Sequence, residues 1–191
     1  SEDHPRVRLH WLIDTAELAV RWTVAVTLAA VLNANSGLPP QASTVVREHV
    51  ERPTLAGWLK ILEALCSTPP ETALLAPGVF DLWRAEMEPR FFPGRTGAGA
   101  GTVENSVLVL RNHVAHGGGM SRSAAAELLG LHLPGLQALL RGVLEATLEA
   151  RVIALEDGSA QMLVGTQPCQ CAVPHILEGQ SDGPWLVGKA G

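Results

Sequence analysis

Apolar side chains recur at helical spacing along most of the chain. From Leu9 to about Asn33 they return every three or four positions, until residues 33–40 supply a polar stop that contains Gly37, Pro39 and Pro40. The same spacing returns, in chain order, over residues 42–50, 55–65, 79–87, 103–114 and 136–148. We therefore expect a mainly α-helical protein in which each helix buries one apolar face.

Polar, Gly and Pro residues predict where the later helices begin and end. Pro89 is expected to interrupt the helix over residues 79–87. Thr102 is predicted to cap a helix that starts at Val103, carries Glu104 in its first turn and ends at Gly117. Ser121 and Ser123 are interpreted as helix caps, before a short helix over residues 123–129 and a separate last helix that starts at Pro134.

The pattern changes after Ala150. Residues 152–155 and 162–164 flank Asp157-Gly158, a dipeptide typical of the two-residue turn in a β-hairpin. A third strand is expected around residues 185–187. We predict a helical domain over residues 1–150, followed over residues 151–191 by a small β appendage or the start of a linker to a further C-terminal module.

Composition narrows the class of protein. With 191 residues, 47% of them hydrophobic, the chain can bury the core of one ordinary domain. Its net charge of −5 argues against broad coating of nucleic acid or of an anionic membrane, so any RNA contact is expected to be local. Residues 22–32 are the most apolar stretch and fall short of the ~20 residues that span a bilayer. Without a secretion signal or a disulfide framework, a cytoplasmic protein without membrane contact is expected.

One stretch combines residues suited to RNA chemistry: Arg111-Asn112-His113-Val114-Ala115-His116, directly before three glycines. Asn112 and His116 are one helical turn apart and can touch, and Arg111 can join them through its long side chain. A histidine can move the proton of a ribose 2′-hydroxyl as that oxygen attacks its own phosphate. An arginine can pair with the phosphoryl oxygens, where negative charge grows. The glycines leave open space for a substrate.

This stretch resembles the R-x4–6-H motif of HEPN domains in its shortest spacing, including the polar residue after the arginine and the His-Gly step. The resemblance spans about residues 8–150 and implies an antiparallel helical bundle with a long antiparallel helical pair. In many catalytic members the motif faces its counterpart across a homodimer. The resemblance thus implies Arg111, Asn112 and His116 as catalytic residues, with His113, Gly117 and Gly118 in contact with the substrate.

A metal-independent endoribonuclease without a cofactor, in a bacterial defence or toxin system, is the function that this resemblance implies. Its partners would be RNA and a second copy of the chain. The alternative is a non-catalytic dimerisation or sensing module of a multidomain protein, coupled to a fused or associated effector. A purely structural interpretation also stays open, in which His116 caps carbonyls, Arg111 pairs with Glu104 or a neighbouring helix, and Gly117 has left-handed backbone angles.

Other candidate sites are weaker. Cys169-Gln170-Cys171 and His175 are ligand types suited to zinc, but no second pair stands at ordinary spacing, so we predict no metal site. Residues 94–101 lack the Lys and Ser or Thr of a phosphate-binding loop and are expected to form a mobile loop. Structural roles are expected for two further groups. The histidines His10, His49, His113 and His132 are interpreted as surface or hydrogen-bonded core residues, and the tryptophans Trp11, Trp22, Trp58 and Trp83 as core or dimer interface.

Overall fold

The chain divides into two compact units, residues 1–147 and 148–191. The structure, a computed structural model, describes residues 4–35, 38–51, 53–67, 77–96, 101–117, 119–147, 151–156, 159–164, 167–171 and 183–187. Every helix lies in the first unit and every strand in the second, as far as the described residues go. The protein is mainly α-helical, as the spacing of its apolar residues predicts.

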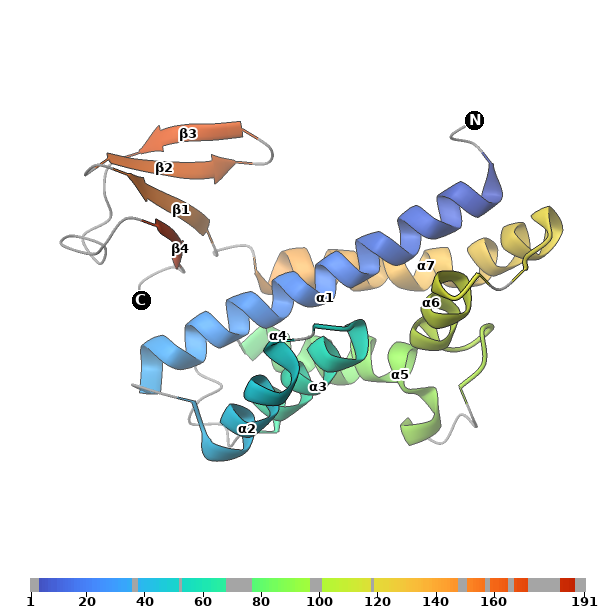
Figure 1. The fold of residues 1–191 in the computed structure, drawn as a ribbon, viewed down its shortest axis with the longest axis horizontal. Helices are drawn as coiled ribbons and strands as arrows, with labels where there is room; N and C mark the ends of the chain where they lie inside the picture. The colour runs from blue at the N-terminus through green and yellow to red at the C-terminus, as the bar shows by residue number, and fades with distance from the viewer. Residues whose placement is uncertain are drawn as a thin grey trace. The chain divides into compact units, whose positions relative to one another are not determined.

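The first unit is built around two long helices, α1 (31 residues) and α7 (25 residues), with shorter helices packed against α1 (Figure 1). The helical elements are α1 (Pro5–Asn35), α2 (Pro40–Val50), α3 (Leu55–Cys66), α4 (Pro77–Leu82), the π-helical η2 (Trp83–Met87), α5 (Glu88–Phe91), the 3₁₀ turn η3 (Pro93–Thr96), α6 (Val107–Ala115) and α7 (Arg122–Ala146). The sequence predicts the extents of α1, α2 and α3 to within a few residues.

The core of this unit lies where α1 meets α3 and α7. The inward side chains of α1 recur every three or four positions, so they form one stripe that packs on both neighbours. Nearly all their surface is buried, so this stripe forms a continuous part of the hydrophobic core. Its members are Leu9, Ile13, Ala16, Val20 and Val24.

The two long helices run in the same direction. Just past the middle of α1, Trp22 Nε1 donates a hydrogen bond of 2.9 Å to the hydroxyl of Thr147, the residue after the C-terminal end of α7. Near their N-terminal ends, Arg6 and Leu9 of α1 share a hollow with Met120, just before α7. The antiparallel long pair that the HEPN resemblance implies is therefore wrong for α1 and α7.

A continuous helical path runs from Pro77 to Phe91, so the expected interruption at Pro89 is wrong. The π-helical turn η2 ends at Met87, two residues before Pro89, and the N–H of Glu88 donates to the carbonyl of Trp83, five residues back. Proline has no N–H and clashes with the carbonyl four positions earlier, and a wider turn relieves both problems. Trp83 and Phe91 are buried on either side of this adjustment.

The predicted loop at residues 94–101 begins with regular structure instead. Residues up to Thr96 belong to the 3₁₀ turn η3, in which the N–H of Arg95 donates to the carbonyl of Phe92 at 3.0 Å. The Arg95 side chain pairs with Glu63 of α3 and lies 4.4 Å over the ring of Phe92. These side-chain contacts, which residue type alone does not reveal, hold the turn. Residues 97–100 lie outside the described residues.

Pro134 lies inside α7, so the predicted short helix and the separate last helix are a single helix. Proline at this position deprives the Gly130 carbonyl of its usual donor. Both Pro134 and Gly130 are exposed, so water can hydrogen-bond that carbonyl. Ser121 is the N-cap and accepts from the N–H of Ala124 at 3.0 Å, which confirms its predicted role, whereas Ser123 lies within the helix.

Helix α6 begins at Val107, four residues later than predicted, and Thr102 is not its cap. Residues 103–105 form a turn, in which a hydrogen bond from the Thr102 side chain, helped by a backbone hydrogen bond, lowers the pKa of Glu104. The N-cap is Ser106, whose hydroxyl accepts from Val109 N–H at 3.3 Å and donates to the Phe91 carbonyl at 3.0 Å. The sequence favours Thr102 as the cap because it directly precedes the apolar Val103. The burial of Ser106, which depends on tertiary structure, cannot be predicted from its neighbours in the sequence.

The second unit contains a four-stranded antiparallel sheet in the order β3-β2-β1-β4. The strands are β1 (Arg151–Glu156), β2 (Ser159–Val164), β3 (Gln167–Cys171) and β4 (Gly183–Val187). β3 was not predicted from the sequence. Asp157-Gly158, the predicted turn, lies outside the described residues, as do nearly all side chains of this unit.

Across the described part of the chain, no helix is long and apolar enough to cross a membrane.

We predict that Ser106→Ala destabilises the helical unit by about 1–2 kcal/mol, because α6 loses its cap and the buried Phe91 carbonyl loses its donor. Ser121→Ala, which removes the exposed cap of α7, is the matched control and should cost less. Urea unfolding followed by tryptophan fluorescence measures both. Equal losses for the two variants would contradict the role given to the Ser106–Phe91 hydrogen bond.

Candidate functional site

The predicted site residues lie at the C-terminal end of α6. Asn112 and His113 are exposed in its last turn, and His116 is the exposed C-cap, whose N–H donates to the Asn112 carbonyl at 3.0 Å. Gly117 follows with φ of +72°, a left-handed conformation that glycine adopts without strain. The left-handed Gly117 of the structural interpretation is therefore confirmed. Gly118 lies outside the described residues.

Arg111 is anchored to α1 by an ion pair. Its Nε donates to Glu17 Oε2 at 3.2 Å, and the side chains of Arg111 and Glu17 are 29% and 13% exposed. Glu17 also pairs with Arg21, one turn further along α1, so one carboxylate bridges two guanidinium groups. This confirms the interpretation in which Arg111 pairs with a neighbouring helix, and the partner is Glu17 instead of Glu104.

The guanidinium, the amide and the imidazole do not form the contact that helical spacing suggested. Arg111 Nη1 lies 3.5 Å from Asn112 Oδ1, so the amide is next to the arginine. Among the described residues, no hydrogen bond joins the side chains of Asn112 and His116. His116 has backbone angles of −88° and 14°, outside the regular helix, so the i, i+4 spacing no longer fixes where its ring points.

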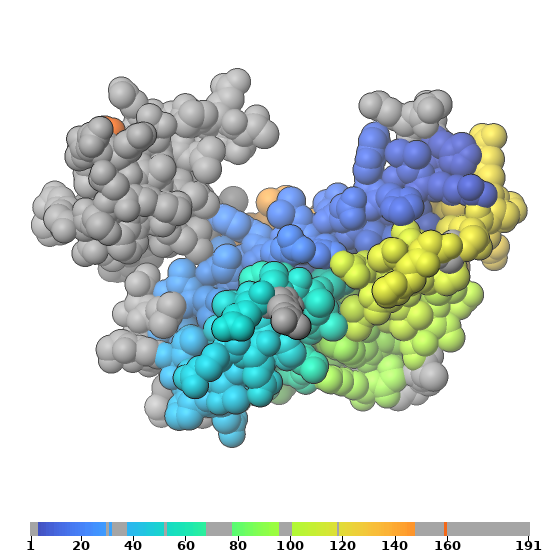
Figure 2. All heavy atoms as spheres, viewed as in Figure 1, coloured from blue at the N-terminus to red at the C-terminus, as the bar shows by residue number. Residues whose placement is uncertain are grey.

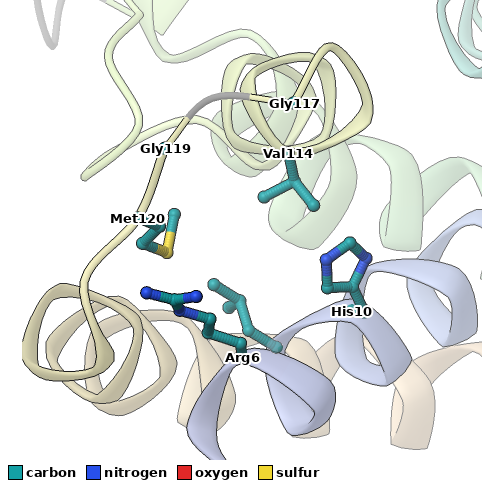
Figure 3. A pocket seen from close by; sticks show the side chains of 7 residues that line it. Arg6, His10, Val114, Gly117, Gly119 and Met120 are labelled. Carbon is teal, nitrogen blue, oxygen red and sulfur yellow. The ribbon is translucent and has the colours of Figure 1, made fainter.

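A hollow of about 240 Å³ opens beside the end of α6 (Figure 3). It is lined by Arg6, Leu9 and His10 from α1, by Val114 and Gly117 from the end of α6, and by Gly119 and Met120 from the segment before α7. In Figure 3 the side chains of Arg6, His10, Val114 and Met120 surround the same opening. The candidate site therefore extends from α6 onto α1. Figure 2 shows the first half of α1, in dark blue, beside α6, in yellow.

Arg6 and His10 were missed as site residues by the sequence analysis, which interpreted His10 as structural. Their i, i+4 spacing places both on one face of α1, and this is the signal that the sequence does carry. The sequence does not show that α1 lies beside α6. The two helices run in opposite directions, so Arg111 contacts Glu17, whereas Gly117 lies near Arg6.

The tryptophans and the remaining histidines fill mainly structural positions. Trp83 is buried, and Trp22 and Trp58 are half-buried, as expected for core residues. Trp11 is 51% exposed on the outer face of α1, so of its two expected places, core or dimer interface, only the second stays a prediction. His132 is buried, and its Nε2 lies 2.8 Å from the Val103 carbonyl, which confirms its interpretation as a hydrogen-bonded core residue.

The cysteines offer no nucleophile or metal site among the described side chains. Burial raises the pKa of the Cys66 thiol to about 12, with Arg84 acting in the opposite direction, so the reactive thiolate is not formed near neutral pH. No group of three potential metal ligands gathers among the described residues. The side chains of Cys169 and Cys171, and residue 175, lie outside that part.

No family model matches the chain, and no similar protein was found among curated proteins or solved structures. Function must therefore be argued from the side chains themselves. One end of α6 presents an anchored arginine, an exposed amide and two exposed imidazoles. Beside them lies a hollow that contains a second arginine and a third imidazole. These groups can bind anions and move protons.

We predict a coupling free energy of about 0.5–1 kcal/mol between Glu17 and Arg111, because their ion pair is only partly screened by solvent. A double-mutant cycle with Glu17→Gln and Arg111→Gln, followed by urea unfolding, measures it. The same cycle for Glu17 and Arg21 is the control, and its coupling should be smaller, since the Arg21 side chain is 48% exposed. Additive effects of Glu17→Gln and Arg111→Gln would show that the pair contributes nothing to stability.

Proposed function

We propose that the helical unit is a metal-independent endoribonuclease of HEPN type that acts as a homodimer, in a bacterial defence or toxin system. The observation that supports this best is the set of groups at the end of α6. The Arg111 guanidinium lies beside the Asn112 amide, and the exposed His116 imidazole stands at the C-cap of the same helix. No cofactor is needed for the chemistry that these groups can perform.

In the proposed reaction, His116 takes the proton of a ribose 2′-hydroxyl as its oxygen attacks the adjacent phosphorus. The bond from phosphorus to the 5′-oxygen breaks, and that oxygen receives a proton from a second imidazole, which leaves a 2′,3′-cyclic phosphate and a 5′-hydroxyl. Arg111 and Asn112 donate hydrogen bonds to the phosphoryl oxygens, where negative charge grows. His113 and the Gly117–Gly118 backbone would contact the RNA.

Glu17 defines how Arg111 can serve this reaction. The carboxylate holds the Nε side of the guanidinium, and the Nη1 side, next to Asn112, faces the phosphate in the proposed complex. A positioned arginine loses little side-chain freedom when it binds an oxyanion. The exposed imidazoles of one chain are open to water, and a second copy would supply the acid and shield the site.

The second candidate is a non-catalytic dimerisation or sensing module coupled to a fused or associated effector. The ion pair with Glu17 favours it, because it gives Arg111 a purely structural reason to be present. Exposed apolar residues on one face of α1 also favour a surface for self-association. These residues are Val7, Trp11 and Leu18.

We predict that the chain cleaves single-stranded or structured RNA in the presence of a metal chelator. Arg111→Ala and His116→Ala should each slow cleavage by about 10²–10⁴-fold, because each removes a group that acts on the transition state. Arg141→Ala, an exposed arginine of α7, is the control and should leave the rate unchanged. Gel analysis with end-group mapping identifies the products. No cleavage by the parent chain, or equal products from the variants, would refute the enzymatic proposal and leave the second candidate.

We predict that specific activity falls as the protein is diluted below the dissociation constant of the proposed homodimer, since one chain would hold only half of the composite site. Multi-angle light scattering over the same range of concentrations gives the mass of the species present. A monomer at every concentration, with a constant specific activity, would contradict the composite site.

A further inference from the structure

The hollow beside α6 has a distinct charge and shape. Among the described residues that line it, the two ionisable ones, Arg6 and His10, are both basic types and none is acidic. Leu9, Val114 and Met120 supply apolar walls. Gly117 has only open space where a side chain would stand. An arginine and a histidine one turn apart, beside an apolar wall, fit an anion attached to an apolar group.

We propose that this hollow binds one phosphate-bearing nucleotide of the RNA, adjacent to the bond that is cut, with Arg6 and His10 on its phosphate. The inference rests on the proposed ribonuclease function and adds a substrate subsite to it. The volume of about 240 Å³ lies just below the ~300–1,000 Å³ of ordinary small-molecule pockets, which favours a ligand portion of no more than one nucleotide inside the hollow.

The position of Gly117 links the hollow to the reacting groups. Gly117 lines the hollow and directly follows His116, so a nucleotide seated there lies next to the residue that would take the proton. The left-handed backbone at Gly117 turns the chain at this point, and its open side leaves room for a sugar and phosphate. Arg6 can hold two phosphate oxygens at once in a planar fork, while the apolar walls cover the sugar or base.

Two probes distinguish a nucleotide from a free phosphate as the ligand of the hollow. A nucleoside 3′,5′-bisphosphate carries the sugar and base that the apolar walls would cover, whereas inorganic phosphate offers only the anion. We expect the bisphosphate to bind at least about tenfold more tightly, since Leu9, Val114 and Met120 contribute only to the larger probe. Equal affinity for the two probes would overturn the nucleotide assignment and leave a site for a free anion.

Isothermal titration calorimetry of the full chain with the bisphosphate tests the residues. Arg6→Gln should raise the Kd by about tenfold, because a charged hydrogen bond to the phosphate is lost, and His10→Gln by several-fold. Arg8→Gln is the matched control, as Arg8 is an exposed arginine of α1 outside the hollow, and should change the Kd less than about twofold. Thermal unfolding of each variant checks that the fold is retained.

The outcomes separate this inference from the ribonuclease proposal. If the bisphosphate binds and only Arg6→Gln and His10→Gln weaken it, the nucleotide site stands, even where no RNA is cleaved. In a cleaving protein, Arg6→Gln should then raise KM by a larger factor than it lowers kcat. If RNA is cleaved but Arg6→Gln and Arg8→Gln behave alike in binding and in KM, the subsite is refuted and the proposed function survives. No binding by the parent chain would also refute the subsite.

Discussion

The packing of α1 is the constraint on which the helical unit depends. Its inward stripe lies against α3 and α7, and almost no surface of Leu9, Val20 or Val24 remains exposed. Replacing any of these side chains by a smaller one would leave a cavity in a close-packed core. Because α1 cannot shift without breaking this packing, it also fixes the groups on its other faces. Near the middle of α1, Glu17 contacts Arg111 of α6. Near the start of α1, Arg6 and His10 line the hollow beside the C-terminal end of α6.

The carboxylate of Glu17 couples that framework to the candidate site. A charge with so little exposed surface requires cationic partners, and Arg21 and Arg111 provide them from two helices. Losing one arginine would leave the other, so the carboxylate is never wholly unpaired. Arg111 therefore has a structural role whatever its chemistry is. A catalytic role would use the side of the same guanidinium that lies beside Asn112, so anchoring and catalysis are compatible within one side chain.

The sequence predicts local features of this fold and misses those that depend on distant contacts. Helical spacing locates α1, α2 and α3, and the Ser121 cap follows from its residue type. Pro89 was expected to interrupt a helix and Pro134 to start one, but both lie within continuous helical segments, where a π turn and an exposed helix face accommodate them. In the candidate site, Arg111, Asn112 and His116 form one contiguous segment, whereas Glu17 is 94 residues from Arg111. No spacing rule connects residues so far apart, and the same holds for Arg6 and His10.

The acidic character of the whole chain does not oppose a phosphate ligand at this position. The net charge of −5 is spread over 191 residues, while exposed charges interact strongly only within a screening length of about 8–10 Å. Arg111 and His116 are five positions apart at the end of α6, so at a rise of about 1.5 Å per residue they lie about 7.5 Å apart along the helix axis, within one screening length. Arg6 and His10 line the hollow at the end of that helix. Among the residues that line the hollow, these two basic side chains carry the charge that a phosphate would meet, and the charge of Glu17 is already compensated by Arg21 and Arg111. Local arrangement, more than total charge, therefore determines whether this surface can hold RNA.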